Sequence, residues 1–284
     1  MLPLTFKDIV DDKKLTEVEL TRDLDNLLSY TAEKNERKFC GNPFLYHYQT
    51  ANLCKVRVKG APSLYDKMND PEMLAKLCRQ AEKLNRTGTP ANRLFEANRF
   101  NNAVVFFKPT TAKWLYKKFG ATKVLDPTAG WGGRMLGAWA LGIDYTGIDT
   151  NTDMIEAYDQ MIDRLPANTS NLTMTFGSCL DVDFSEIEYD MVLTSPPYVN
   201  LEMYENMSKF ESNAAFYRDF LIPLLKKCLA HIKTGGYVCF NISPKMYDDL
   251  LAAGYRAADM TEDLLQQKRL GADKQDKIYC WRRH

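Results

Sequence analysis

The spacing of hydrophobic residues divides the chain into a helical first part and an alternating second part. Up to residue 102, apolar side chains recur every three or four positions, the spacing of one helix face. The capping-box sequence at 16–19 starts one predicted helix, and Asp70-Pro71 starts another. Residues 36–63 are mixed, and residues 85–102 are expected to end the second helix. The predicted buried faces comprise Leu20, Leu24, Leu27 and Leu28, and then Met73, Leu74, Leu77, Cys78, Ala81 and Leu84.

From residue 103 to 284, strand patterns alternate with helix patterns. This rhythm predicts an α/β fold with a mainly parallel sheet and helices on both faces. We therefore expect two parts, a mainly helical N-terminal region (1–102) and a Rossmann-like domain (103–284). The pattern predicts strands at 123–126, 145–149, 172–176, 190–194, 237–242 and 277–281, and helices at 132–141, 152–165, 216–232 and 246–253.

Composition is that of an ordinary globular protein. Hydrophobic residues make up 45% of the 284 positions, which is enough for a sizeable core without a metal or disulfides. The seven cysteines include no C-x-x-C pair, and free thiols suit a reducing, intracellular compartment. Cys40, His47 and Cys54 match no familiar zinc spacing, so we expect no metal. Neither a signal peptide nor a membrane-spanning run is evident, so we expect a cytoplasmic protein without a membrane partner.

A glycine-rich turn follows the first strand of the second part. Asp126-Pro127-Thr128-Ala129-Gly130-Trp131-Gly132-Gly133 lies between a predicted strand and a predicted helix, where glycines let the backbone approach a ligand closely. Asp149 ends the next strand, where a carboxylate can accept hydrogen bonds from a ribose diol. A carboxylate at Asp126 would repel a pyrophosphate and attract a sulfonium. The turn therefore favours S-adenosylmethionine over a nicotinamide dinucleotide.

A second motif, Thr194-Ser195-Pro196-Pro197-Tyr198, follows an apolar strand of the same predicted sheet. Two prolines make a stiff extended arm that lacks two backbone donors. The Ser195 hydroxyl and the Pro196 carbonyl could accept the hydrogens of a base amine, and Tyr198 could stack on the base. A base inside a duplex must be flipped out to be reached. The alternative for this motif is a strand-to-loop transition with two prolines, and the alternative for the glycine-rich turn is a surface turn with acids at the strand ends.

Together the two motifs resemble those of the S-adenosylmethionine-dependent DNA amino-methyltransferases, from about residue 105 to 284. The resemblance implies a class I methyltransferase sheet, S-adenosylmethionine as the cofactor and DNA as the substrate. It implies a catalytic role for Ser195, Pro196, Pro197 and Tyr198. It implies cofactor contacts at Lys108, Pro109, Asp126, Pro127, Gly130, Trp131, Gly132, Asp149, Thr150, Cys179 and Asp181. Serine in the first tetrapeptide position favours cytosine N4 over adenine N6.

Recognition of DNA is expected to fall to the N-terminal region and the loop 199–213, because only 86 residues follow Tyr198. Residues 55–99 carry ten basic and five acidic side chains in a chain whose net charge is +0. Such a local excess can contact phosphates, although a solvated charged helix surface is an equal alternative. The preferred candidates for DNA contacts are Arg79, Arg86, Arg93 and Arg99.

Three alternatives to DNA methylation remain open. RNA guanine-N2 and protein glutamine methyltransferases use related tetrapeptides, but these usually begin with asparagine or aspartate. An inactive relative would bind the cofactor without transferring a methyl group, although both motifs are intact in this sequence. A nicotinamide dehydrogenase would need a dinucleotide cradle that the glycine turn does not provide.

Overall fold

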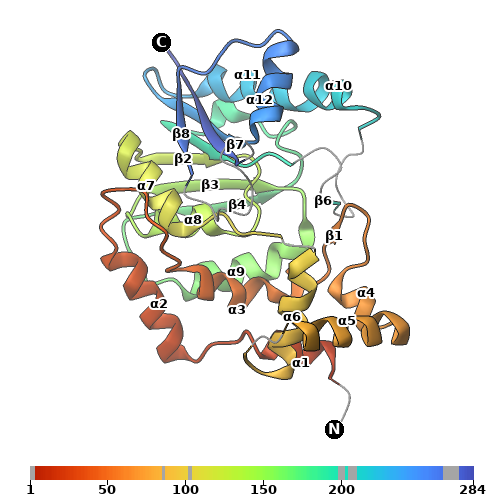
Figure 1. The fold of residues 1–284 in the computed structure, drawn as a ribbon. Coiled ribbons are helices and arrows are strands. Elements are labelled where there is room, and N and C mark those ends of the chain that lie inside the picture. The colour runs from red at the N-terminus through yellow and green to blue at the C-terminus, as the bar shows by residue number, and fades with distance from the viewer. Residues whose placement is uncertain (1–3, 85–86, 102–103, 198–201, 204–209, 265–274) are drawn as a thin grey trace.

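A seven-stranded sheet forms the centre of the computed structural model, which describes residues 4–84, 87–101, 104–197, 202–203, 210–264 and 275–284 (Figure 1). The strand order is β4-β3-β2-β5-β7-β9-β8. The first five of these strands run parallel, whereas β9 is antiparallel to both β7 and β8. The strands are β2 (Lys123–Asp126), β3 (Asp144–Asp149), β4 (Leu172–Phe176), β5 (Met191–Thr194), β7 (Tyr237–Ile242), β8 (Met260–Asp263) and β9 (Lys277–Arg282).

Helices cover both faces of the sheet, as the sequence predicts. Figure 1 shows α10, α11 and α12 on one side and α7, α8 and α9 on the other. Strand side chains alternate between the faces, so Val124 packs toward one core and Leu125 toward the other. The helices of this part are α7 (Pro109–Phe119), α8 (Gly133–Trp139), α9 (Ile155–Arg164), α10 (Asn213–Phe216), α11 (Ile222–His231) and α12 (Pro244–Ala252).

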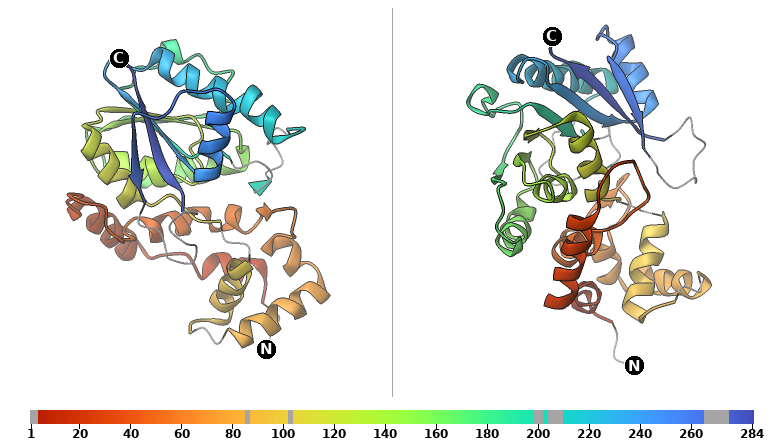
Figure 2. Two further views of the ribbon diagram at one scale, coloured as in Figure 1. Left: turned by 45° about the horizontal axis from the view of Figure 1, so that its top comes forward. Right: turned by 90° about the vertical axis from the view of Figure 1, so that its left-hand side faces the viewer.

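The N-terminal helices pack on the α7–α9 side of the sheet (Figures 1 and 2). Leu20, Leu24 and Phe44 belong to the same buried cluster as Val124 of the sheet. Lys113 of α7 is also buried, and its ammonium donates to the last carbonyls of α2, those of Leu27 and Leu28. The N-terminal helices are α1 (Phe6–Asp11), α2 (Glu17–Ser29), α3 (Asn42–Leu53), α4 (Leu64–Met68), α5 (Pro71–Lys83) and α6 (Pro90–Asn101).

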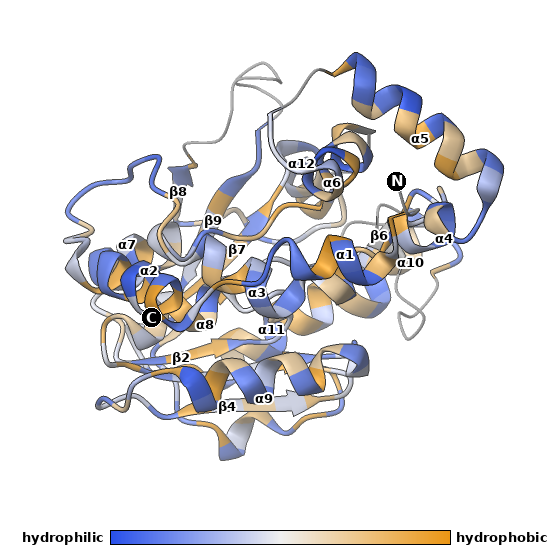
Figure 3. Ribbon diagram, turned by 90° about the horizontal axis from the view of Figure 1, so that it is seen from below, coloured by the Kyte–Doolittle hydropathy of each residue, from blue (hydrophilic) through white to orange (hydrophobic). Residues whose placement is uncertain are grey.

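A two-stranded antiparallel pair lies apart from the central sheet. β1 (Arg57–Val58) pairs with β6 (Glu202–Met203), so the N-terminal region meets the chain that follows the tetrapeptide. α5 lies at the edge of the molecule, where Figure 3 shows hydrophilic and hydrophobic turns alternating along it. Leu77 and Ala81 are its buried residues. The rest of its predicted stripe is half-buried.

The α/β class and several strand boundaries are confirmed. Strands 123–126, 172–176 and 237–242 have the predicted limits. Other expectations are wrong. Residues 90–101 form α6 rather than only ending the preceding helix, and the mixed stretch 36–63, for which no element is predicted, contains α3. Leu28 is 43% exposed and does not belong to the buried face of α2.

The predicted helix 216–232 is interrupted. Residues Tyr217–Leu221 form a wider π turn between α10 and α11. Pro223, near the start of α11, has no backbone N–H to donate and its ring crowds the carbonyl four residues earlier, which explains the break. α7 and the edge strand β8 are further elements that the sequence pattern does not predict.

Two features of the described residues bear on partners. No helix among them is both long and apolar enough to cross a membrane. Within the same residues, no three histidine, cysteine, aspartate or glutamate side chains gather as metal ligands would. His47 instead accepts the backbone N–H of Leu15 at 2.8 Å, and burial lowers its pKa.

Candidate active site

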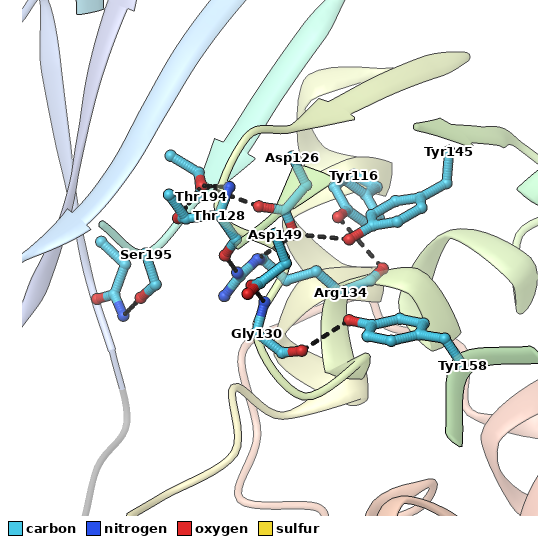
Figure 4. A network of polar contacts seen from close by, with 11 residues as sticks. Tyr116, Asp126, Thr128, Gly130, Arg134, Tyr145, Asp149, Tyr158, Thr194 and Ser195 are labelled. Atoms are coloured by element: carbon cyan, nitrogen blue, oxygen red, sulfur yellow. Dashed lines mark hydrogen bonds and ion pairs between the residues drawn. The ribbon is translucent and has the colours of Figure 1, made fainter. Parts of the chain in front are cut away.

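The carboxylate of Asp126, at the end of β2, is the centre of a buried polar network (Figure 4). Its Oδ2 accepts from Arg134 Nε at 2.6 Å and from the Tyr145 hydroxyl at 2.7 Å. Its Oδ1 accepts from the Thr194 hydroxyl at 2.8 Å. In the sequence Asp126 reads as an uncompensated charge, whereas in the structure Arg134 pairs with it. The charge of this buried carboxylate is compensated, and its hydrogen bonds hold the loop; a cofactor contact at Asp126 stays a prediction.

Thr194 connects the glycine loop to the strand that carries the tetrapeptide. Its hydroxyl oxygen lies 2.6 Å from that of Thr128 and accepts the Thr128 backbone N–H at 3.2 Å. Thr194 ends β5, and Ser195 follows it directly. The two motifs therefore meet at the carboxyl ends of the neighbouring parallel strands β2 and β5, where α/β sheets place their ligands.

The conformation of the glycine loop depends on its glycines and on a hydrogen bond from a neighbouring helix. Gly130 has a φ of 59° and Gly132 a φ of 89°, which a residue with a side chain rarely adopts. The Gly130 carbonyl accepts from the Tyr158 hydroxyl at 2.8 Å. Pro127 and Trp131 are buried and Gly130 is half-buried, so the loop backbone reaches the surface at Gly130.

Asp149 ends β3 and faces this loop (Figure 4). One oxygen accepts the Gly130 N–H at 2.7 Å and the other the Asn151 N–H at 2.9 Å. A carboxylate has about four acceptor positions, so two remain for a ligand. Burial raises the pKa of Asp149 to about 6, against the opposing effect of the two N–H donors. Thr150, next in the chain, is half-buried.

The segment before α7 lies against the start of α8. Lys108 is the residue before α7, its pKa is lowered by burial, and its ammonium lies 4.8 Å from the ring centre of Phe39. Pro109 is buried at the first position of the helix. A Cβ at Gly133 would stand 1.8 Å from the backbone oxygen of Phe107. Glycine is therefore required for this segment to lie beside the loop.

This contact gives a stability prediction. Gly133→Ala should lower the free energy of unfolding by about 1–3 kcal/mol, because the backbone at Phe107 must move aside. The matched control is Gly177→Ala, where an added Cβ meets nothing within 4 Å. Urea unfolding followed by circular dichroism measures both variants. Equal midpoints for the two variants would contradict the proposed close approach.

Ser195 has an unpredicted partner. Its Oγ accepts a hydrogen bond of 2.7 Å from Nδ2 of Asn241, on β7. Pro196 is buried and Pro197 half-buried. Tyr198 lies outside the described residues. Asn241 is an isolated polar residue near the end of an apolar strand. This pattern in the sequence could have identified it as a candidate site residue.

The loop after β4 places its two candidate residues differently. Cys179 is buried in the core with Leu125 and Ile148, and burial raises the pKa of its thiol to about 12. Asp181 is exposed. The ammonium of Lys227 donates to the Cys179 carbonyl at 3.2 Å, which holds this loop on the sheet. An adenine contact at Cys179 would therefore come from its backbone.

The candidate DNA-contacting arginines do not share one environment. Arg79 is exposed on α5, and Arg93 is half-buried on α6. Arg86 lies outside the described residues. Arg99 pairs with Glu96 at 3.3 Å, and its guanidinium lies 5.5 Å from the ring centre of Tyr46. Arg99 is therefore partly committed to packing within the N-terminal region.

The order of the strands decides the fold class. Five parallel strands followed by an antiparallel strand β9 between β7 and β8 form the sheet of class I methyltransferases. The chain has a class I methyltransferase fold. No family model matches the sequence, and no curated protein matches it.

Solved structures with similar folds include several methyltransferases. TrmN from Thermus thermophilus has a TM-score of 0.45 and 16% identity, over 76% of this chain and 79% of that one. An RNA methyltransferase from Salinibacter ruber, in complex with S-adenosyl-L-homocysteine, has a TM-score of 0.40 and 18% identity, over 63% and 92%. A T. thermophilus 16S rRNA N2 methyltransferase, in complex with AdoMet and guanosine, has a TM-score of 0.41 and 16% identity, over 65% and 45%. These likenesses concern the fold alone.

Proposed function

We propose that this protein uses S-adenosylmethionine to methylate the exocyclic amine of a flipped base in DNA, with cytosine N4 favoured over adenine N6. The observation that carries the proposal is the direct connection between the two motifs. Thr194, which precedes Ser195, donates to Asp126 at the start of the glycine loop at 2.8 Å. A methyl donor on the loop and an acceptor at the tetrapeptide would therefore lie side by side, which is the main requirement of a two-substrate transfer.

The residues at the strand ends fit this cofactor. Asp149 retains acceptor positions for a ribose diol beside the half-buried backbone of Gly130. An added Cβ at Gly130 would meet nothing closer than 3.9 Å, so the space beside the loop is open. When bound, the cofactor would supply an electrophilic methyl group on a positively charged sulfur. The segment at Lys108 and Pro109 would close over its methionine end.

The tetrapeptide would orient the base. The Pro196 carbonyl accepts one hydrogen of the amine, and the Ser195 hydroxyl bonds to the same edge of the ring. The bound cofactor would supply its methyl group to the amine nitrogen with loss of the carbon–sulfur bond, and the nitrogen would release a proton to solvent. The positive charge that develops on the nitrogen favours the carbonyl acceptor most in the transition state. Tyr198 would stack on the base and keep it flipped.

Cofactor binding should depend on pH through Asp149. Its raised pKa means that the folded chain keeps a proton between pH 3.8 and about 6 that the unfolded chain releases, so ionisation in this window destabilises the fold. A ribose diol donates more strongly to the ionised carboxylate than to the protonated carboxyl group. Affinity for S-adenosylhomocysteine should therefore rise with pH up to about 6 and then level off.

Isothermal titration calorimetry from pH 5 to pH 8 measures this dependence. Asp149→Asn should bind more weakly and without the rise, because an amide does not titrate in this range. A rise of the same size in Asp149→Asn would assign the titration to another group.

The reaction is tested with labelled S-adenosylmethionine and unmethylated DNA, followed by digestion and mass spectrometry of the nucleosides. The proposal expects N4-methylcytosine. N6-methyladenine would keep the reaction and overturn the choice of base. Label in RNA or protein instead of DNA would assign the chain to a related substrate class. Tight cofactor binding with no transfer to any of the three would make it an inactive binder.

A further inference from the structure

Asn241 lies beside the tetrapeptide but belongs to another strand. β5 and β7 pair in parallel with Thr194 opposite Phe240, so the next residues, Ser195 and Asn241, also stand opposite each other. Asn241 is only 7% exposed, and its Nδ2 donates to Ser195 Oγ at 2.7 Å. The carboxamide is therefore held at the point where the base amine would arrive.

The other end of this carboxamide has no partner. Asn241 Oδ1 is buried, and no hydrogen bond from the described residues reaches it. A buried acceptor without a donor is unfavourable, and such groups are rare in folded proteins. A ligand that displaces the atoms covering this oxygen and donates an N–H would satisfy it.

The bond from Asn241 also limits what Ser195 can do. A serine hydroxyl has one donor and two acceptor positions. Asn241 Nδ2 occupies one acceptor position, which leaves the O–H free to donate. The pair therefore presents two complementary groups to a substrate, an acceptor at Asn241 Oδ1 and a donor at Ser195.

We propose that Asn241 and Ser195 together read an amino group and the unprotonated ring nitrogen beside it, a proposal that rests on the function proposed above. Asn241 Oδ1 accepts one amine hydrogen and the Pro196 carbonyl the other, while Ser195 donates to the ring nitrogen. Cytosine offers N4 and N3 in this pattern, and adenine offers N6 and N1. On its Watson–Crick edge guanine offers two donors, N1–H and the N2 amine, so its N1–H would face the Ser195 donor. The unprotonated N3 on the other side of the guanine amine lies on the sugar edge, away from the edge that enters the site, so guanine is rejected.

The test uses oligothymidylate strands that carry one central cytosine, adenine or guanine, because thymine has no exocyclic amine. Fluorescence anisotropy with the S-adenosylhomocysteine-loaded protein measures binding, and methyl transfer is measured on the same strands. We expect the cytosine or adenine strand to bind at least about tenfold more tightly than the guanine strand. Asn241→Leu should remove this preference and lower methyl transfer at least about 100-fold, with unchanged affinity for S-adenosylhomocysteine.

Cys239→Ala is the matched control, because Cys239 is buried on the same strand and face two residues earlier. It should keep both the preference and the transfer rate, which separates substrate contact from general disturbance of β7. Asn241→Asp is a second variant of nearly the same shape. It removes the donor to Ser195 and should also lose the preference.

The two proposals fail in different ways. If no DNA strand is methylated but the binding preference exists and Asn241→Leu removes it, DNA methylation is wrong and the role of Asn241 stands. If Asn241→Leu binds and transfers like the wild type, or the guanine strand is equally preferred, the role of Asn241 is overturned, whether or not cytosine is methylated. A loss of the same size in Cys239→Ala would also overturn it.

Discussion

Ser195→Ala should lower methyl transfer about 100-fold or more while leaving the affinity for S-adenosylhomocysteine unchanged. The hydroxyl lies at the carboxyl end of β5, and Asn241 holds it at 2.7 Å. Its removal takes away a positioned hydrogen-bonding group but leaves Asp149 and the glycine loop intact. Single-turnover rates give the transfer step, and calorimetry gives the affinity.

Ser29→Ala is the control for this substitution. Ser29 is exposed at the end of α2, and its hydroxyl bonds only to the local carbonyl of Asn26 among the described residues. It should transfer methyl groups at the wild-type rate. Unchanged turnover in Ser195→Ala would show that the Ser195 hydroxyl takes no part in methyl transfer. Weaker binding of S-adenosylhomocysteine would show that Ser195 contacts the cofactor and not the base.

Arg134→Met should lower the free energy of unfolding by about 3–5 kcal/mol, because it leaves the buried carboxylate of Asp126 without a counter-charge. Arg134 is only 3% exposed and Asp126 is 0% exposed. Their ion pair spans 2.6 Å, and the Coulombic attraction of Asp126 holds the pKa of Arg134 above its usual range in spite of burial. Urea unfolding measures the loss.

A double variant separates lost charge compensation from lost packing. Asp126→Asn added to Arg134→Met removes the uncompensated charge. The amide oxygen can still accept from Tyr145 or from Thr194, and the other hydroxyl can turn to accept from the amide NH2. The double variant should recover most of the lost stability. If it is no more stable than Arg134→Met alone, the cost comes from the cavity left by the guanidinium and not from the charge.

The sheet was predictable because its strands are short apolar runs with clear ends. Leu125 and Val192 read as strand residues because both faces of the sheet are covered. The two motifs were also placed correctly at strand ends, because the backbone preferences of glycine and proline end strands whatever packs around them. The edge strand β8 is mostly exposed and carries no such pattern.

The hydrophobic pattern of the sequence did not predict the helices that bury polar as well as apolar side chains. α7 buries a lysine and two threonines along with its apolar residues, so no polar face marks it as a helix. α3 likewise buries Gln49 and Thr50. The role of Asp126 also depended on a contact that no sequence pattern shows. Arg134, eight positions later, neutralises it across the loop.

The shared core of the N-terminal helices and the sheet has a consequence for synthesis. A ribosome releases Leu20, Leu24 and Phe44 long before it makes β2, β3 and β5, whose buried residues belong to the same core. The apolar faces of the N-terminal helices therefore stay exposed until the sheet is synthesised, and exposed apolar surface promotes aggregation. Chaperone dependence during translation should accordingly be greatest before the strands that share this core have emerged.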